Sequence, residues 1–202
     1  MLPPEADTDA EVAPPAEGDP GRGKWISRRG LIEWGVIILV AVLAALGLRA
    51  FVVQPYFIPS GSMEPTLQIN DKVLVNKLSY DFHSVHRGDI IVFKKPPNDT
   101  SEGVKDLIKR VIGLPGETIW SGPNGEIFVN GQLIKQPWLT AQAQTDPGPP
   151  VPKTVIPKGD YFVMGDNRGD SSDSRVFGPI SGHLIVGRAF LRVWPLSRLG
   201  TL

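Results

Sequence analysis

The feature that most constrains this chain is an apolar segment near its amino terminus. From Leu31 to Leu48 the sequence is almost entirely hydrophobic, and Glu33 is its one charged residue. A membrane-spanning helix needs about 20 apolar residues, and the run reaches that length if it continues to Val53. The apolar core of a cleaved signal peptide is only about 7 to 15 residues long. The longer run therefore predicts an uncleaved transmembrane anchor over residues 28–53.

The residues that flank this segment predict its orientation. Lys24, Arg28 and Arg29 lie at its amino-terminal end, and positively charged flanks favour the cytoplasmic side of a membrane. Residues 1–27 are rich in Pro, Ala, Gly and acidic residues, without an apolar period. Such a composition predicts a disordered tail. We therefore expect a cytoplasmic tail, a single pass through the cell membrane, and a body on the external side.

The body, residues 54–202, contains many short apolar runs. Each run is bounded by Gly, Pro, Asn or Asp, as in "KVLVNKL", "DIIVFKK", "LIKRVIGL" and "YFVMGDN". Runs punctuated in this way are typical of strands in an antiparallel β domain. The pair Asn130-Gly131 predicts a hairpin turn, and residues 121–157 are expected to form a smaller excursion or cap. The predicted fold class is mainly β: one amino-terminal transmembrane helix, then an antiparallel β-rich catalytic domain.

Composition excludes several kinds of chemistry. The chain has no cysteine, which rules out disulfides, thiolate zinc sites and a cysteine nucleophile. Lys+Arg and Asp+Glu are equal at 21 each, so nothing indicates the basic surface of a nucleic-acid binder. The acidic stretch "DNRGDSSDSR" does not fit a calcium loop that starts at Asp166. Its sixth and twelfth positions are Ser171 and Phe177, where such a loop has Gly and Glu.

The stretch "IPSGSMEPTL", residues 58–67, places two serines shortly after the apolar segment. Ser62 does not fit the nucleophile-elbow pattern G-x-S-x-G, because Ser60 and Glu64 occupy the glycine positions. The three histidines, at positions 83, 86 and 183, lie in no recognisable triad setting, although a triad is defined by geometry rather than by spacing. If a serine here is a nucleophile, its base remains to be found.

A lysine could be that base. Lys109 lies in "DLIKRVIGLPG", where strand alternation would place it on one face with Leu107 and Val111. The ordinary pKa of a lysine amine is about 10.4, and both burial and the positive charge of Arg110 would lower it. Spacing and composition alone favour the alternative, a snorkelling lysine or a surface residue beside Arg110.

Four stretches, in this order after an amino-terminal span, resemble the boxes of type I signal peptidases: "PSGSMEPTL", "RGDIIVFKKP", "IKRVIGLPGE" and "GDNRGDSSDSR". These are membrane-bound serine-lysine proteases that remove signal peptides from exported proteins after a small-x-small motif. The resemblance covers most of residues 53–195. It implies that Ser62 is the nucleophile and that Lys109 is the general base.

The resemblance also implies supporting roles for other residues. Ser60 would help the backbone N–H of Ser62 to form an oxyanion hole, and Ser171 would orient the lysine amine. A structural polar cluster would contain Asp166, Asp173 and Arg175. Apolar side chains would line the substrate pockets, namely those of Phe57, Ile58, Met63, Leu67, Val92 and Ile108. No metal ion or cofactor is implied.

The partners implied are preproteins that bear signal peptides, the lipid bilayer and a nearby secretion translocon, with no nucleic acid. Three other interpretations remain open. The first is an inactive membrane-anchored paralogue. The second is a specialised serine-lysine processing protease of pilin or conjugation type, and the third is a β-rich envelope scaffold without catalysis. The presence of both Ser62 and Lys109 argues against the first. A repressor-type protease would need a DNA-binding segment, and the amino-terminal tail is too short and too acidic to be one.

Overall fold

The computed structural model describes residues 28–101, 103–139, 141 and 145–202. The predicted disordered tail, residues 1–27, lies outside the described residues. The chain divides into two compact units, Met1–Ala44 and Ala45–Leu202.

Helix α1, Arg28–Val52, occupies the apolar segment. Its apolar side chains are exposed, as shown by Leu31 at 57%, Ile38 at 60% and Leu43 at 58%. The structure thus confirms a helix at the predicted residues. In the part of the chain that the structure describes, no helix is long and apolar enough to cross a membrane, so the predicted span is not confirmed.

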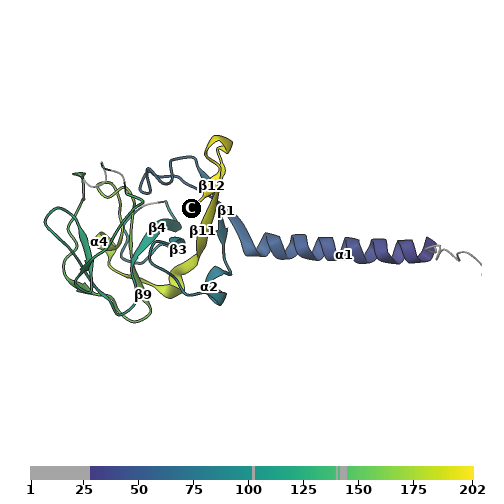
Figure 1. The fold of residues 1–202 in the computed structure, drawn as a ribbon, viewed down its shortest axis with the longest axis horizontal. Helices are drawn as coiled ribbons and strands as arrows, with labels where there is room; N and C mark the ends of the chain where they lie inside the picture. The colour runs from purple at the N-terminus through teal and green to yellow at the C-terminus, as the bar shows by residue number, and fades with distance from the viewer. Residues whose placement is uncertain (1–27, 102, 140, 142–144) are drawn as a thin grey trace, which may run out of the picture. The chain divides into compact units, whose positions relative to one another are not determined.

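The remainder of the chain is mainly β and antiparallel, as predicted. Figure 1 shows its main sheet, in which β3, β4 and β11 lie side by side. The strand order is β1 (Val53–Phe57), β2 (Lys72–Asn76), β11 (Ile185–Trp194), β3 (Ile90–Lys94), β4 (Asp106–Gly113), β9 (Asp160–Met164) and β10 (Ile180–Ser181), and β12 (Gly200–Thr201) pairs with β11. Strands β2 and β11 are neighbours in the sheet although they are far apart in sequence. Their pairing brings the two ends of the body together.

A second sheet of four strands is built largely from the predicted excursion at 121–157. Its order is β7 (Gln132–Leu133), β6 (Ile127–Val129), β5 (Thr118–Ser121) and β8 (Thr154–Val155). Asn130 and Gly131 connect β6 to β7 with φ values of 51° and 85°. Both residues are left-handed, as the tight hairpin turns that favour Asn-Gly require, so the predicted hairpin is confirmed.

The body also contains short helical turns: α2 (Ser79–Phe82), α4 (Ser174–Phe177), η1 (Gly182–Leu184) and η2 (Leu196–Arg198). Strand β4 is buried on both faces. Ile108 packs in a hydrophobic cluster with Met63 and Leu67, whereas Val111 belongs to a second cluster with Phe177 of α4. A strand buried on both faces reads as a nearly continuous apolar run. Any charged residue within β4 must therefore find its partners inside the protein.

Candidate active site

The loop between β1 and β2, residues 58–71, carries the predicted nucleophile. Two backbone hydrogen bonds close its base: the N–H of Ile58 donates to the carbonyl of Asp71 over 3.0 Å, and the N–H of Asn70 donates to the carbonyl of Ile58 over 2.9 Å. Met63 and Leu67 have no exposed surface, so the middle of the loop is fixed in the core. Ser62 precedes Met63 and is itself only 8% exposed.

The side chain of Lys109 meets this loop from β4. Its Nζ lies 2.6 Å from Oγ of Ser62, and the residue is 3% exposed. Burial lowers the pKa of Lys109 to about 8, because an ammonium loses its hydration inside the protein. The negative charge of Asp173 opposes this effect, and the positive charge of Arg175 adds to it.

The predicted influence of Arg110 on Lys109 needs correction. Arg110 follows Lys109 on β4, so its side chain points to the opposite face of the strand. Its guanidinium forms two hydrogen bonds with Asp166, of 2.8 and 2.6 Å. Its charge is thereby neutralised at close range. The arginine that lowers the pKa of Lys109 is Arg175, from α4.

This pair of groups can transfer a proton at ordinary pH. With a pKa of about 8, roughly a tenth of the Lys109 amines are neutral at pH 7, against fewer than one in a thousand for an unperturbed lysine. A neutral amine within hydrogen-bond distance of a hydroxyl satisfies the geometric requirement for a general base. The arrangement fits nucleophilic catalysis by Ser62.

A cleft of about 300 Å³ opens beside these two residues. Ser60, Ser62, Ile108 and Lys109 line it, together with Ser172 and the carboxylates of Asp106 and Asp170. The hydroxyl of Ser60 lies 3.4 Å from Oγ of Ser62. The cleft thus opens beside Ser62, and Lys109, at its wall, is almost fully buried.

Ser171 occupies a buried position beside the loop. Its Oγ is buried and has no hydrogen-bond partner among the described residues, so its role in orienting Lys109 stays a prediction. Gly165 lies against it: a Cβ there would come within 2.3 Å of Oγ of Ser171 and within 2.4 Å of the carbonyl oxygen of Ser62. Because residue 165 is glycine, Oγ of Ser171 and the carbonyl oxygen of Ser62 can both pack against its Cα.

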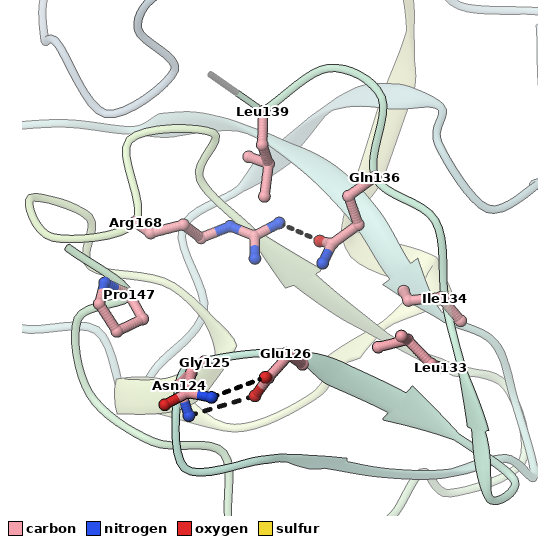
Figure 2. Close-up of a pocket in the computed structure, with 9 residues that line it drawn as sticks. All are labelled: Asn124, Gly125, Glu126, Leu133, Ile134, Gln136, Leu139, Pro147 and Arg168. Atoms are coloured by element: carbon pink, nitrogen blue, oxygen red, sulfur yellow. Dashed lines mark hydrogen bonds between the residues drawn. The ribbon is translucent and has the colours of Figure 1, made fainter. Parts of the chain in front are cut away.

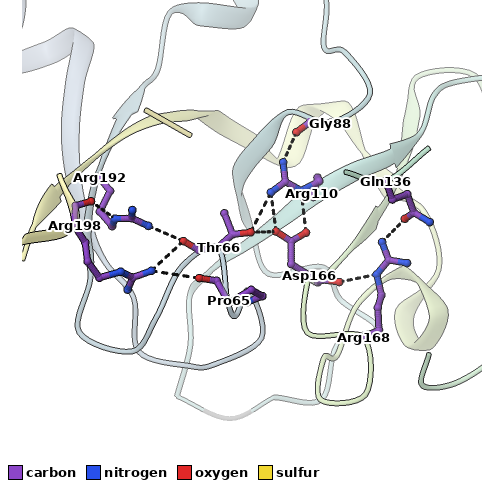
Figure 3. Close-up of polar contacts among 10 residues, drawn as sticks. Pro65, Thr66, Gly88, Arg110, Gln136, Asp166, Arg168, Arg192 and Arg198 are labelled. Atoms are coloured by element: carbon purple, nitrogen blue, oxygen red, sulfur yellow. Dashed lines mark hydrogen bonds and ion pairs between the residues drawn. The ribbon is translucent and has the colours of Figure 1, made fainter. Parts of the chain in front are cut away.

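The side chains of the three predicted members of the polar cluster are buried, and they form two ion pairs, one of which includes Arg110. Arg175 donates to both carboxylate oxygens of Asp173 over 2.8 Å. Burial raises the pKa of Asp173, but hydrogen bonds from Arg175 and its charge more than offset that, and the net pKa is lowered. Asp166 pairs with Arg110 and also accepts a 2.6 Å hydrogen bond from Oγ1 of Thr66 (Figure 3).

Sequence reasoning missed some residues of this site. The sequence predicts Arg110 only as a neighbour of Lys109, although a second charged residue in an apolar strand signals a buried partner. Asn167 was not singled out: its backbone N–H donates to the carbonyl of Ser62 over 3.1 Å, and its Nδ2 donates to the carbonyl of Gly61 over 3.2 Å. These contacts fix the backbone at Gly61 and Ser62, the predicted nucleophile, and no sequence pattern revealed them.

The six predicted pocket residues differ in how they lie relative to the cleft. Five of the six belong to one cluster of the hydrophobic core: Ile58, Met63, Leu67, Val92 and Ile108. Ile108 lines the cleft, whereas Phe57 is 54% exposed and is not among the lining residues. Core packing of Met63 and Leu67 shapes the cleft indirectly, because it fixes the loop that carries Ser62.

A second cavity, of about 330 Å³, shares no lining residue with the cleft. Figure 2 shows the guanidinium of Arg168 reaching across it to the side-chain oxygen of Gln136, to which it donates a hydrogen bond. Nε of Arg168 donates to the carbonyl of Gly165 over 3.0 Å. Burial lowers the pKa of Arg168 to about 10. The sequence predicted nothing here.

This site, a serine hydroxyl beside a buried lysine amine on a β-rich body, lies in a chain that is similar to a known family. The family model "Signal peptidase, peptidase S26" matches residues 31–194. The chain belongs to this family of peptidases.

Its relatives are similar over most of their length. Signal peptidase I of Leptolyngbya laminosa is 38% identical over 203 residues, which cover 98% of this chain and 96% of that protein. The probable signal peptidase I-2 of Synechocystis sp. is 39% identical over 172 residues, 85% of this chain and 77% of that protein. Signal peptidase IB of Staphylococcus aureus is 36% identical over 184 residues, 84% of this chain and 93% of that protein. The chain is accordingly a serine endopeptidase that cleaves signal peptides.

Proposed function

We propose that this peptidase cleaves amino-terminal signal peptides from exported preproteins with Ser62 as the nucleophile and Lys109 as the general base. One observation carries the proposal: Nζ of Lys109 lies 2.6 Å from Oγ of Ser62. Burial lowers the pKa of Lys109 to about 8, which makes the neutral amine accessible. No histidine or metal ion is needed for the proton transfer.

Catalysis proceeds through a covalent intermediate. Neutral Nζ of Lys109 takes the hydroxyl proton of Ser62 as Oγ attacks the carbonyl carbon of the scissile peptide bond. The C–N bond then breaks, and the ammonium of Lys109 returns the proton to the departing amine. This leaves an ester between Ser62 and the signal peptide. The same amine next removes a proton from water as the water oxygen attacks the ester carbon. The bond from that carbon to Oγ then breaks, and the ammonium returns the proton to Oγ of Ser62, which releases the signal peptide as a carboxylic acid.

The negative oxygen formed in each attack needs hydrogen-bond donors. We assign this role to the backbone N–H of Ser62 and the hydroxyl of Ser60, which is exposed at the cleft and lies 3.4 Å from Oγ of Ser62. One such donor contributes roughly 3 to 4 kcal/mol to transition-state stabilisation. Ser171, buried beside Ser62 and Gly165, is assigned to orienting the amine of Lys109.

Specificity for a small-x-small motif follows from steric exclusion. Small side chains before the cut would enter the apolar part of the cleft beside Ile108. Larger groups would meet walls backed by the hydrophobic core of Met63 and Leu67, which resists expansion because protein interiors are close-packed.

We also propose attachment to the cell membrane through segment 28–53, as a single pass with a cytoplasmic amino end and an external body. The apolar sequence of this segment and the exposed apolar side chains of α1 support lipid contact. Basic residues before the apolar run, such as Arg28 and Arg29, support the orientation. This location would place the enzyme beside the secretion translocon that delivers its substrates.

The proposal is tested by cleavage of a preprotein by the full chain in detergent. Ser62→Ala and Lys109→Ala should each abolish cleavage while keeping the fold. Lys105→Ala is the matched control, because Lys105 is exposed and four residues before Lys109, and it should retain activity. Activity in Ser62→Ala would overturn the assignment. An inactive wild-type chain would favour a scaffold or an inactive paralogue, and a serine-directed reactive probe would separate those from an enzyme given the wrong substrate.

A further inference from the structure

Two arginines of the β11–β12 hairpin reach the loop that carries Ser62. Nη1 of Arg192, on β11, donates to the carbonyl of Thr66 over 2.7 Å. Nη1 of Arg198, on η2, lies 3.0 and 2.9 Å from the two carboxylate oxygens of Asp71. Its Nη2 lies 3.3 Å from the carbonyl of Pro65 and 3.4 Å from that of Thr66. Figure 3 shows both guanidinium groups at the carbonyl of Thr66, and that of Arg198 also at the carbonyl of Pro65.

The hairpin also holds its two arginines in place. Nε of Arg192 donates to the carbonyl of Arg198 over 2.5 Å, and Arg192 pairs with Gly200 across the β11–β12 ladder. Asp71, 1% exposed, accepts a further hydrogen bond of 2.9 Å from the N–H of Gln68. Contacts within the hairpin and at Asp71 therefore fix the two guanidinium groups where they meet the loop.

Thr66 is held from the opposite side as well. Its Oγ1 donates to Asp166 over 2.6 Å, and Asp166 is paired with Arg110, the residue that follows Lys109 on β4. Thr66 is thus fixed through its carbonyl by the hairpin and through its hydroxyl by the charges beneath the site. Ser62 lies only four residues before Thr66, which is fixed from both sides.

We propose that Arg192 and Arg198 are positioning residues, which hold Thr66 and Asp71 so that Oγ of Ser62 stays at Nζ of Lys109. The inference rests on the proposed roles of Ser62 and Lys109. Neither arginine lines the cleft, so neither is expected to bind substrate. The position of the nucleophile matters because a displacement of about 1 Å can cost roughly 100-fold in rate.

The main test is Arg192→Met in the full chain, assayed in detergent on a preprotein. We expect kcat to fall by about 10- to 100-fold with little change in KM, because the loop shifts and the cleft remains. Loosening the loop also admits water to Lys109. The rise of kcat/KM with pH should therefore move to higher pH than in the wild type.

Two further variants refine the test. Arg192→Lys keeps the charge, but its single amine cannot reproduce the two separate donors to Thr66 and Arg198, so it should restore only part of kcat. Arg198→Met alone would leave Asp71 buried with a weakened partner. The double variant Arg198→Met/Asp71→Asn removes that charge and should show the same loss of kcat and the same shift with pH. Each variant is checked by thermal unfolding.

Arg188→Met is the matched control, because Arg188 is also on β11 but pairs with Asp89 at the surface. It should keep wild-type kcat and the wild-type pH onset. If Arg192→Met and the double variant keep both as well, while Ser62→Ala is inactive, the positioning role is overturned and the proposed function stands. A loss of activity that follows the melting temperature without a shifted pH onset also overturns it. An active Ser62→Ala would instead refute the proposed function.

Discussion

At the scale of the residue, the chemistry depends on how strongly Lys109 is desolvated. The residue is 3% exposed, and burial lowers its pKa to about 8. Since only the neutral amine accepts a proton, kcat/KM should rise with pH and level off above an apparent pKa near 8. Lys109→Arg should be inactive at every pH, because a guanidinium stays protonated.

The measurement for this prediction is the pH profile of kcat/KM with a preprotein substrate, with Lys105→Arg as the control for the substitution itself. Lys105 is exposed, so its variant should follow the wild-type profile. A profile that is flat between pH 7 and 9, or a loss of activity in Lys105→Arg alone, would contradict the assignment of the base.

Lys109 should also cost stability at neutral pH. Its folded pKa of about 8 lies below the unfolded value of 10.5, so the unfolded chain binds more protons and the free energy of unfolding rises with pH between these values. The destabilisation that the buried lysine causes is complete below pH 8 and vanishes above about pH 10.5. Lys109→Met should therefore be more stable than the wild type at pH 7, by at most on the order of 3 kcal/mol.

Urea unfolding of the two proteins at pH 7 and at pH 10.5 measures this difference. The advantage of Lys109→Met should shrink at the higher pH. A variant that is less stable than the wild type at pH 7 would show that contacts of the lysine with Ser62 and the nearby carboxylates outweigh its desolvation.

At the scale of the element, the segment that follows β9 packs against the loop that carries Ser62. Gly165 follows β9, and a Cβ there would meet both Ser171 and the carbonyl of Ser62 at less than 3.0 Å. Backbone cannot yield as a flexible side chain can, so Gly165→Ala should displace the nucleophile loop. We expect at least a tenfold loss of kcat/KM, by the sensitivity of catalysis to misplacement, with a lowered melting temperature.

Gly200→Ala is the control for this prediction, since the nearest atom to a Cβ at Gly200 is 4.0 Å away. Kinetic assay and thermal unfolding of the two variants, side by side, separate a local displacement from a general effect of losing a glycine. Wild-type activity in Gly165→Ala would show that Ser62 and Ser171 can move apart without consequence.

At the scale of the whole molecule, the apolar surface of α1 should determine where the enzyme works. The side chains of Ile38 and Val42 are 60% and 47% exposed. The double variant Ile38→Lys/Val42→Lys should lose association with lipid vesicles, because charged residues are costly in hydrocarbon. Val155→Lys, at a 67% exposed position of the body, should bind vesicles as the wild type does.

The orientation has a separate test. If the body is external, protease added to sealed spheroplasts should digest residues 54–202 of the wild-type chain. Full protection of the body, with digestion only after lysis, would reverse the predicted orientation.

The sequence by itself determined those features that depend on local pattern. Apolar continuity predicted the helix that α1 forms, and punctuated apolar runs predicted the antiparallel body. Asn130-Gly131 predicted its hairpin because few residue pairs adopt two left-handed conformations at low cost. The order of four motifs identified the family and singled out Ser62 and Lys109, because each motif is a continuous stretch of chain.

Tertiary structure alone decided which distant groups meet. Adjacency in sequence placed Arg110 beside Lys109, but only the fold pairs it with Asp166 and leaves Arg175 to act on the amine. Met63 and Leu67 became core residues because β2, β3, β4 and β11 close around them. The contact of Arg192 with Thr66 spans 126 residues. Such contacts follow from strand order and register, and a one-residue slip in register would exchange every side chain between the two faces of a strand.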